Sequence, residues 1–149
     1  MNAPNPPTLR TLNSKPLPGV ELLHLTDTRT RRVEKIEPST PGRLSIYACG
    51  PTVYRFAHVG NLRTFLLSDL IRRVATLQGL QVTVVQNITD VGHLQGDADE
   101  GEDKIAKKAK LEQLEPMEVA QQYTDTYHRD MALLNTWKPS IEPRATGHI

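Results

Sequence analysis

A strand–helix–strand pattern over residues 44–88 constrains the fold of this 149-residue chain more than any other feature. Residues 44–49 form a short apolar run that stops at Gly50-Pro51, as a buried strand does. A helix is expected next, with Asn61 as its N-cap and Gly79 as the residue that ends it. Apolar residues recur there every three or four positions and predict one buried face: Leu62, Leu66, Leu70, Val74 and Leu77.

Residues 81–88 complete the pattern, because their many β-branched side chains favour a second strand. Two strands joined by a helix make a βαβ unit, in which the strands are parallel. The sequence therefore predicts an α/β fold built around a parallel sheet.

The flanking segments carry weaker signals. Residues 1–19 contain five prolines and are expected to be a disordered arm, which leaves residues 20–149 as the folded part. Residues 21–25 and 32–36 favour a small hairpin, residues 96–103 an acidic loop, and residues 102–111 a helix. Pro116 suits the first position of a longer helix, and residues 138–149 are expected to be irregular. That longer helix has an apolar face made of Ala120, Tyr123, Tyr127, Met131 and Leu134.

The composition gives no indication of a protein that binds nucleic acid or membranes through a large net charge. The chain has 18 Lys and Arg against 17 Asp and Glu, so bulk charge does not indicate a nucleic-acid or membrane partner. No apolar stretch is long enough for a transmembrane helix or typical of a signal peptide. The single cysteine, Cys49, cannot form an intramolecular disulfide, and we expect a cytoplasmic protein.

The loop of residues 49–61 is the predicted functional site. It leaves the end of a parallel strand and enters a helix N-terminus, where backbone N–H groups and the helix dipole favour an anion such as phosphate. His58 can donate a hydrogen bond there, and Gly60 permits close approach of a ligand. The loop has neither the dinucleotide-binding glycine pattern nor a Walker A sequence, so these residues alone predict a phosphate site of unspecified kind.

Four ordered motifs narrow this prediction. Cys-Gly-Pro-Thr-Val-Tyr at residues 49–54 and His-Val-Gly-Asn at 58–61 resemble the first signature of cysteinyl-tRNA synthetases. Asn-Ile-Thr-Asp at 87–90 and Pro-Arg-Ala-Thr at 143–146 are similar to later segments of that family. A related cysteine ligase of mycothiol synthesis shares the scaffold, but Val53-Tyr54 after Pro51-Thr52 favours the tRNA synthetase.

The resemblance implies an incomplete Rossmann-like class I synthetase catalytic domain and a cysteine–tRNA ligase reaction. ATP, L-cysteine and tRNA-Cys are the implied partners. Cys49 is the implied first ligand of a zinc ion that holds the substrate cysteine, with Gly50 and Thr64 close to that substrate. His58 and Asn61 are the implied catalytic residues. The implied ATP-binding residues are Pro51, Thr52, His58, Gly60 and Asn61.

Two departures from the family pattern shape the functional prediction. Asn61 stands where the tetrapeptide usually ends in histidine. The remaining zinc ligands and a lysine-containing ATP loop belong downstream of residue 149, so the chain is expected to be an N-terminal part that is inactive alone. Two alternatives remain open: a truncated paralogue that binds adenine nucleotide without ligase activity, and a non-functional fragment.

Overall fold

The computed structural model of the chain describes residues 23–91, 109–110 and 115–148. The predicted arm of residues 1–19, the acidic loop of residues 96–103 and most of the helix expected over 102–111 lie outside these residues. The described elements run in the order β1 (His24–Asp27), β2 (Arg32–Lys35), β3 (Arg43–Ala48), α1 (Val59–Leu77), β4 (Gln81–Gln86), α3 (Pro116–Leu133) and the short 3-10 helix η1 (Ala145–Gly147).

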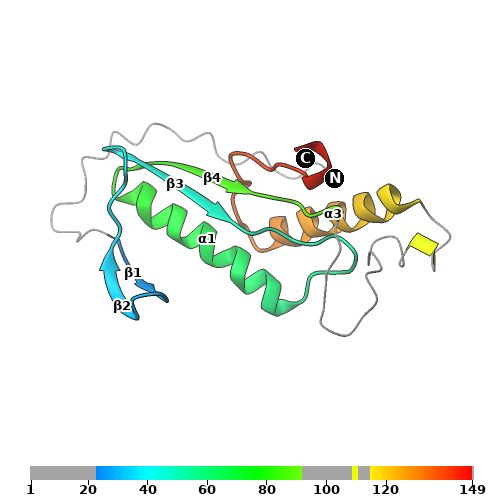
Figure 1. The fold of residues 1–149 in the computed structure, drawn as a ribbon, viewed down its shortest axis with the longest axis horizontal. Helices are drawn as coiled ribbons and strands as arrows, with labels where there is room; N and C mark the ends of the chain where they lie inside the picture. The colour runs from blue at the N-terminus through cyan, green and yellow to red at the C-terminus, as the bar shows by residue number, and fades with distance from the viewer. Residues whose placement is uncertain (1–22, 92–108, 111–114, 149) are drawn as a thin grey trace.

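The predicted βαβ unit is confirmed. Strands β3 and β4 are parallel and pair from Arg43 with Gln81 to Ala48 with Gln86. Helix α1 joins them and runs alongside the pair (Figure 1). Gly79 follows the helix with a φ of +84°, a left-handed conformation that glycine adopts without steric cost. The βαβ unit therefore begins and ends close to where the sequence pattern placed it.

The N-terminal hairpin is also confirmed. Strands β1 and β2 pair antiparallel, with His24 opposite Lys35 and Asp27 opposite Arg32. At the turn, a carboxylate oxygen of Asp27 accepts a hydrogen bond of 2.7 Å from the backbone N–H of Arg29. Short polar side chains favour turns through local bonds of this kind.

The predicted N-cap of α1 was wrong by three residues. His58, rather than Asn61, is the N-cap, and its Nδ1 accepts a hydrogen bond of 3.1 Å from the backbone N–H of Gly60. Asn61 occupies the third helical position, where its Oδ1 accepts from the backbone N–H of His58 at 3.2 Å. The two side chains form a reciprocal capping box, so Asn61 stabilises the helix start without being its first residue.

The predicted apolar stripe of α1 was also wrong for most of its length. The buried residues of the helix are Phe65, Asp69 and Ala75. Leu70 and Leu77 of the stripe are 49% and 58% exposed, because α1 has apolar residues on more than one side. Periodicity cannot choose between two apolar sides, and here the side that includes Phe65 packs on the core.

Residues 140–145 are more regular than predicted. They form parallel bridges beside β4, with Val85 opposite Ile141 and Ile88 opposite Arg144. Backbone hydrogen bonds continue this pairing, including one of 2.8 Å from Ile88 N–H to the carbonyl of Pro143. The sequence pattern missed this segment because Pro143 and the charged residues on either side of it are atypical of a strand.

The core lies between α3, the first half of α1 and the segments that follow β3 and β4. Phe65 of α1 meets Tyr127 of α3 edge to face, with ring centroids 5.3 Å apart. As predicted, Pro116 begins α3, and Ala120, Tyr123 and Tyr127 lie on its buried face. The core cluster is Val53, Phe65, Ile88, Ala109, Val119, Ala120, Tyr123 and Tyr127.

Candidate functional site

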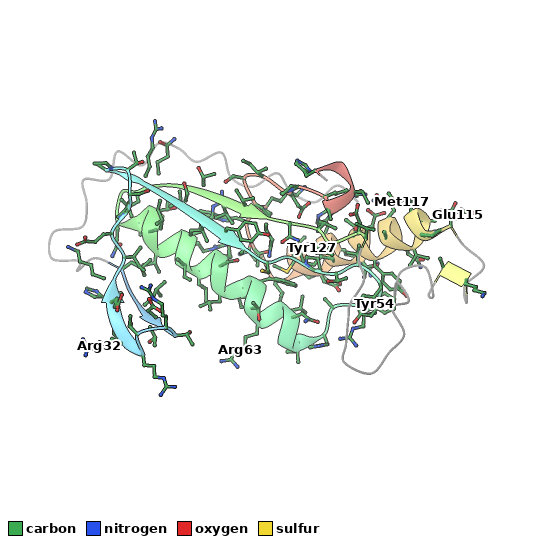
Figure 2. The ribbon with its side chains drawn as sticks, in the orientation of Figure 1. Arg32, Tyr54, Arg63, Glu115, Met117 and Tyr127 are labelled. Atoms are coloured by element: carbon green, nitrogen blue, oxygen red, sulfur yellow. The ribbon has the colours of Figure 1, made fainter. Side chains whose placement is uncertain are left out.

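A cavity of about 290 Å³ lies where the chain leaves β3 and enters α1. This volume is close to the lower end of the range for small-molecule sites. Helix α3 supplies one wall, where Tyr127 lies between the helix and the strands (Figure 2). The cavity is lined by Cys49, Gly50, Pro51, Thr52, Val53, Tyr54, Arg55, Phe56, Ala57, Asn61, Thr64, Phe65, Tyr123 and Tyr127.

Most of the predicted site residues meet at this cavity. Cys49, Gly50, Pro51 and Thr52 line it from the end of β3, and Asn61 and Thr64 line it from the first turns of α1. These positions are up to fifteen residues apart in sequence. The strand–loop–helix turn therefore brings the two halves of the first signature to one small space.

The other two predicted residues, His58 and Gly60, lie at the start of α1 and do not line the cavity. The space above Gly60 is filled by the His58 ring, since a Cβ there would lie 2.9 Å from Cε1 of His58. Because Nδ1 of His58 accepts the Gly60 N–H, the neutral ring carries its proton on Nε2. His58 can thus cap the helix and still offer an N–H donor to solvent or to a ligand.

Gly50 is required by a close approach of two chain segments. A Cβ at this position would lie 1.6 Å from the backbone carbonyl oxygen of Asn87. The backbone N–H of Gly50 donates a hydrogen bond of 3.1 Å to Oδ1 of Asn87. The peptide that follows Cys49 is therefore held against the end of β4 by both shape and hydrogen bonding.

Tyr127 was predicted from sequence only as a core residue, and it is both buried and part of the cavity wall. Its hydroxyl donates a hydrogen bond of 3.0 Å to Oε1 of Gln86. Burial, with a further contribution from the negative charge of Glu142, raises the pKa of Tyr127 above its ordinary value of 10.0. The phenol is consequently a neutral hydrogen-bonding group at physiological pH.

Arg55 and Phe56 are cavity residues that sequence reasoning missed. Arg55 is the one charged side chain among the described residues that line the cavity, and its guanidinium lies 5.3 Å from the ring centre of Tyr54. Phe56 packs edge to face on Tyr123 of α3, with ring centroids 5.1 Å apart. Their position in the sequence, between the motifs at 49–54 and 58–61, could have indicated that they belong to the site.

Asp90 proves to stabilise the fold next to the site. It is 3% exposed, and its two carboxylate oxygens accept from the backbone N–H of Thr146 at 3.0 Å and from its hydroxyl at 2.7 Å. A carboxylate that is buried needs such partners. This contact joins the motif at 87–90 to the motif at 143–146.

A zinc site is not assembled by the residues that the structure describes. Cys49 has an exposed thiol, but within the described ranges no group of three or more His, Cys, Asp or Glu side chains could hold a metal ion. Zinc normally takes three or four such ligands. The described residues therefore do not fit zinc by themselves, and no chemical step is assigned to it.

The comparisons with known proteins agree with the motifs. Residues 35–149 match the family model described as the tRNA synthetases class I (C) catalytic domain. The chain is 54% identical over 127 residues to the cysteine–tRNA ligase of Thermus thermophilus. The aligned residues make up 85% of this chain and 26% of that protein. The chain is 53% identical over 135 residues to the cysteine–tRNA ligase of Deinococcus radiodurans, where the aligned residues make up 91% and 26% respectively. The chain thus spans about a quarter of the length of these relatives.

Within the described residues, no helix has both the length and the apolar character needed to cross a membrane.

Proposed function

Because the chain belongs to the class I (C) tRNA synthetase catalytic-domain family, we propose that it supplies the cysteine- and ATP-facing pocket of a cysteine–tRNA ligase. The observation that carries this proposal is the cavity, where six of the eight predicted site residues lie together. Residues 20–149 would be the N-terminal part of the catalytic domain. Since the chain covers only 26% of such a relative, binding of the two small substrates is the part of the activity that this chain can be asked to show.

The proposed reaction activates an amino acid and then transfers it. A carboxylate oxygen of L-cysteine attacks the α-phosphorus of ATP, the bond from that phosphorus to the bridging oxygen breaks, and pyrophosphate leaves. The cysteinyl group of the resulting adenylate then passes to a hydroxyl at the 3′ end of tRNA-Cys, which releases AMP. The protein contributes by aligning the reactants and by stabilising the charge on the phosphate.

The cavity and the adjoining start of α1 suit these tasks. The N-terminus of α1 would attract the ATP phosphates through its dipole, with the Asn61 amide as a donor in the cavity wall and Nε2 of His58 as a donor at the helix start outside it. Pro51, Thr52 and Gly60 are assigned to the nucleotide with them, and Cys49, Gly50 and Thr64 to the amino acid. Zinc at Cys49 would need ligands from outside the described residues, so it is left out of these roles.

Calorimetric titration of the chain with ATP and with L-cysteine tests the proposal. We expect saturable binding of both, and weaker ATP binding for Asn61→Ala. Arg63→Ala is the matched control, because Arg63 is a neighbouring residue of α1 whose side chain projects away from the body of the molecule (Figure 2). Pyrophosphate exchange into ATP that depends on cysteine would extend the result from binding to catalysis.

The alternatives give different results in the same experiments. A nucleotide-binding paralogue would bind ATP but not L-cysteine and would show no cysteine-dependent exchange. A chain that binds neither ligand at millimolar concentration would contradict the proposed function.

A further inference from the structure

The side chain of Asn87 forms three hydrogen bonds at the point where β3 and β4 end. Its Oδ1 accepts from the backbone N–H of Gly50 at 3.1 Å and from the hydroxyl of Tyr47 at 3.1 Å. Its Nδ2 donates to the hydroxyl oxygen of Thr89 at 3.0 Å. One side chain therefore connects β3, the peptide after Cys49 and the residue two positions further along its own segment.

The Gly50 bond is the one that bears on the site. Gly50 directly follows Cys49 and lines the cavity, so its peptide orientation sets where the cysteine side chain and the cavity wall lie. The absence of a Cβ lets this peptide approach the backbone of Asn87 more closely than any other residue could. The Asn87 amide then satisfies the N–H that the close approach would otherwise leave without a partner.

The Thr89 bond fixes the other side of the same turn. The backbone of Thr89 pairs with the loop after β3, accepting from Val53 N–H at 3.1 Å and donating to the carbonyl of Pro51 at 2.9 Å. Because Nδ2 of Asn87 donates to the Thr89 oxygen, the hydroxyl proton of Thr89 is left to donate elsewhere. An amide is the side chain that accepts toward Gly50 and donates toward Thr89 at once.

We propose that Asn87 is a positioning residue of this site, which holds the Cys49–Gly50 peptide in the geometry that the amino-acid substrate meets, while its bond to Thr89 fixes the orientation of the Asn87 amide itself. This deepens the proposed function and rests on it for the identity of the substrate. Asn87 does not line the cavity among the described residues, whereas Gly50 does, so Asn87 acts through Gly50 rather than by touching the ligand.

Hydrogen exchange of the Gly50 amide tests the positioning role in the chain itself. Asn87→Ala should raise the exchange rate of this amide by about tenfold, because its acceptor is lost. Asn87→Asp should restore most of the protection, because an Asp oxygen still accepts from Gly50. Tyr47→Phe is the matched control, since it removes the Tyr47 bond to the same oxygen and leaves the Gly50 bond in place. An unchanged rate in Asn87→Ala, with the wild-type fold kept by circular dichroism, would overturn the proposal.

Titration with L-cysteine and with ATP supplies the second measurement. For Asn87→Ala we expect the Kd for L-cysteine to rise by about fivefold or more while the Kd for ATP changes less than about twofold, and for Asn87→Asp we expect a Kd for L-cysteine near that of the wild type. If Asn87→Ala weakened the binding of L-cysteine and of ATP to the same extent, the loss would reflect general unfolding and would contradict a positioning role. If the wild-type chain binds no L-cysteine, the proposed function fails, whereas the exchange rates of Gly50 still decide whether Asn87 positions this peptide.

Discussion

At the scale of single residues, Gly50 shows that the site depends on the close approach of two backbone segments, one after β3 and one after β4. Gly50 lies so near the backbone of Asn87 that a side chain there would overlap its carbonyl oxygen. From sequence, Gly50 was the residue at which the strand ends and, through the family resemblance, a residue close to the substrate. Its physical requirement comes from Asn87, which directly follows β4 and is distant in sequence, and local sequence patterns carry no information on such a contact.

Gly50→Ala should destabilise the fold by about 3 kcal/mol or more, because the new Cβ meets backbone, which cannot move aside easily. Gly147→Ala is the control, since a Cβ there would have no heavy atom within 4 Å. Its effect should stay within about 0.5 kcal/mol. Urea denaturation of both variants measures the difference, and equal stabilities would show that β3 and β4 do not approach as described.

Arg55→Ala should weaken ATP binding by about tenfold, because Arg55 is the one cation among the described residues that line the cavity. The loss should shrink at high salt, since the side chain is exposed and its charge is screened. Calorimetry at two salt concentrations measures both effects. Arg63→Ala should change affinity less than about twofold, and an equal loss in the two variants would argue for a diffuse charge effect instead.

At the scale of elements, the sequence predicted most helices and strands and the buried face of α3, but not the buried face of α1. The β3–α1–β4 unit, the hairpin and α3 were all expected. The N-cap of α1 is His58 and not Asn61. Both residues belong to one capping box, and the sequence pattern does not say which of the two is the N-cap. The pairing of residues 140–145 with β4 was missed, since parallel pairing depends on partners distant in the chain.

Two substitutions in α1 test its buried face. Phe65→Ala should lower the free energy of unfolding by about 3–5 kcal/mol, because Phe65 is 6% exposed within the core cluster. Leu77→Ala should change it by less than about 0.5 kcal/mol, because Leu77 is exposed and alanine favours helix. A larger loss of stability for Leu77→Ala than for Phe65→Ala would instead support the buried face predicted from periodicity.

The contact between Tyr127 of α3 and Gln86 of β4 predicts that the stability of the fold depends on pH in the alkaline range. The raised pKa of Tyr127 means that the folded chain holds this proton more tightly than the unfolded chain does. The stabilisation is thus fully present below the unfolded-state pKa of about 10 and is lost as pH rises through the folded-state pKa. Between those values it falls by about 1.4 kcal/mol per pH unit.

Tyr127→Phe removes this titration and should give a flatter stability curve above pH 10. Tyr47→Phe, which alters an exposed tyrosine, is the matched control. Urea midpoints measured from pH 8 to pH 11 compare the three proteins. Parallel curves for wild type and Tyr127→Phe would contradict the raised pKa.

At the scale of the whole molecule, the cavity joins segments that are far apart in the sequence. The cavity gathers the first signature, α1 and α3 in one place, yet Cys49 has no partner ligands for zinc among the described residues. Most of the predicted strand and loop residues line the cavity together because they are nearly consecutive in the sequence. The sequence could not place Tyr123 and Tyr127, because their position in the wall depends on how α3 packs.

The central claim is that the cavity binds the substrates of cysteine activation. Titration of the ¹⁵N-labelled chain with L-cysteine and then ATP, followed residue by residue through the backbone amides, tests it most directly. The account predicts saturable shifts at Cys49, Gly50 and Thr64 with L-cysteine and at Thr52 and Asn61 with ATP, while amides of the β1–β2 hairpin stay unchanged. Saturable shifts confined to other surfaces, or no shifts at millimolar ligand, would contradict it.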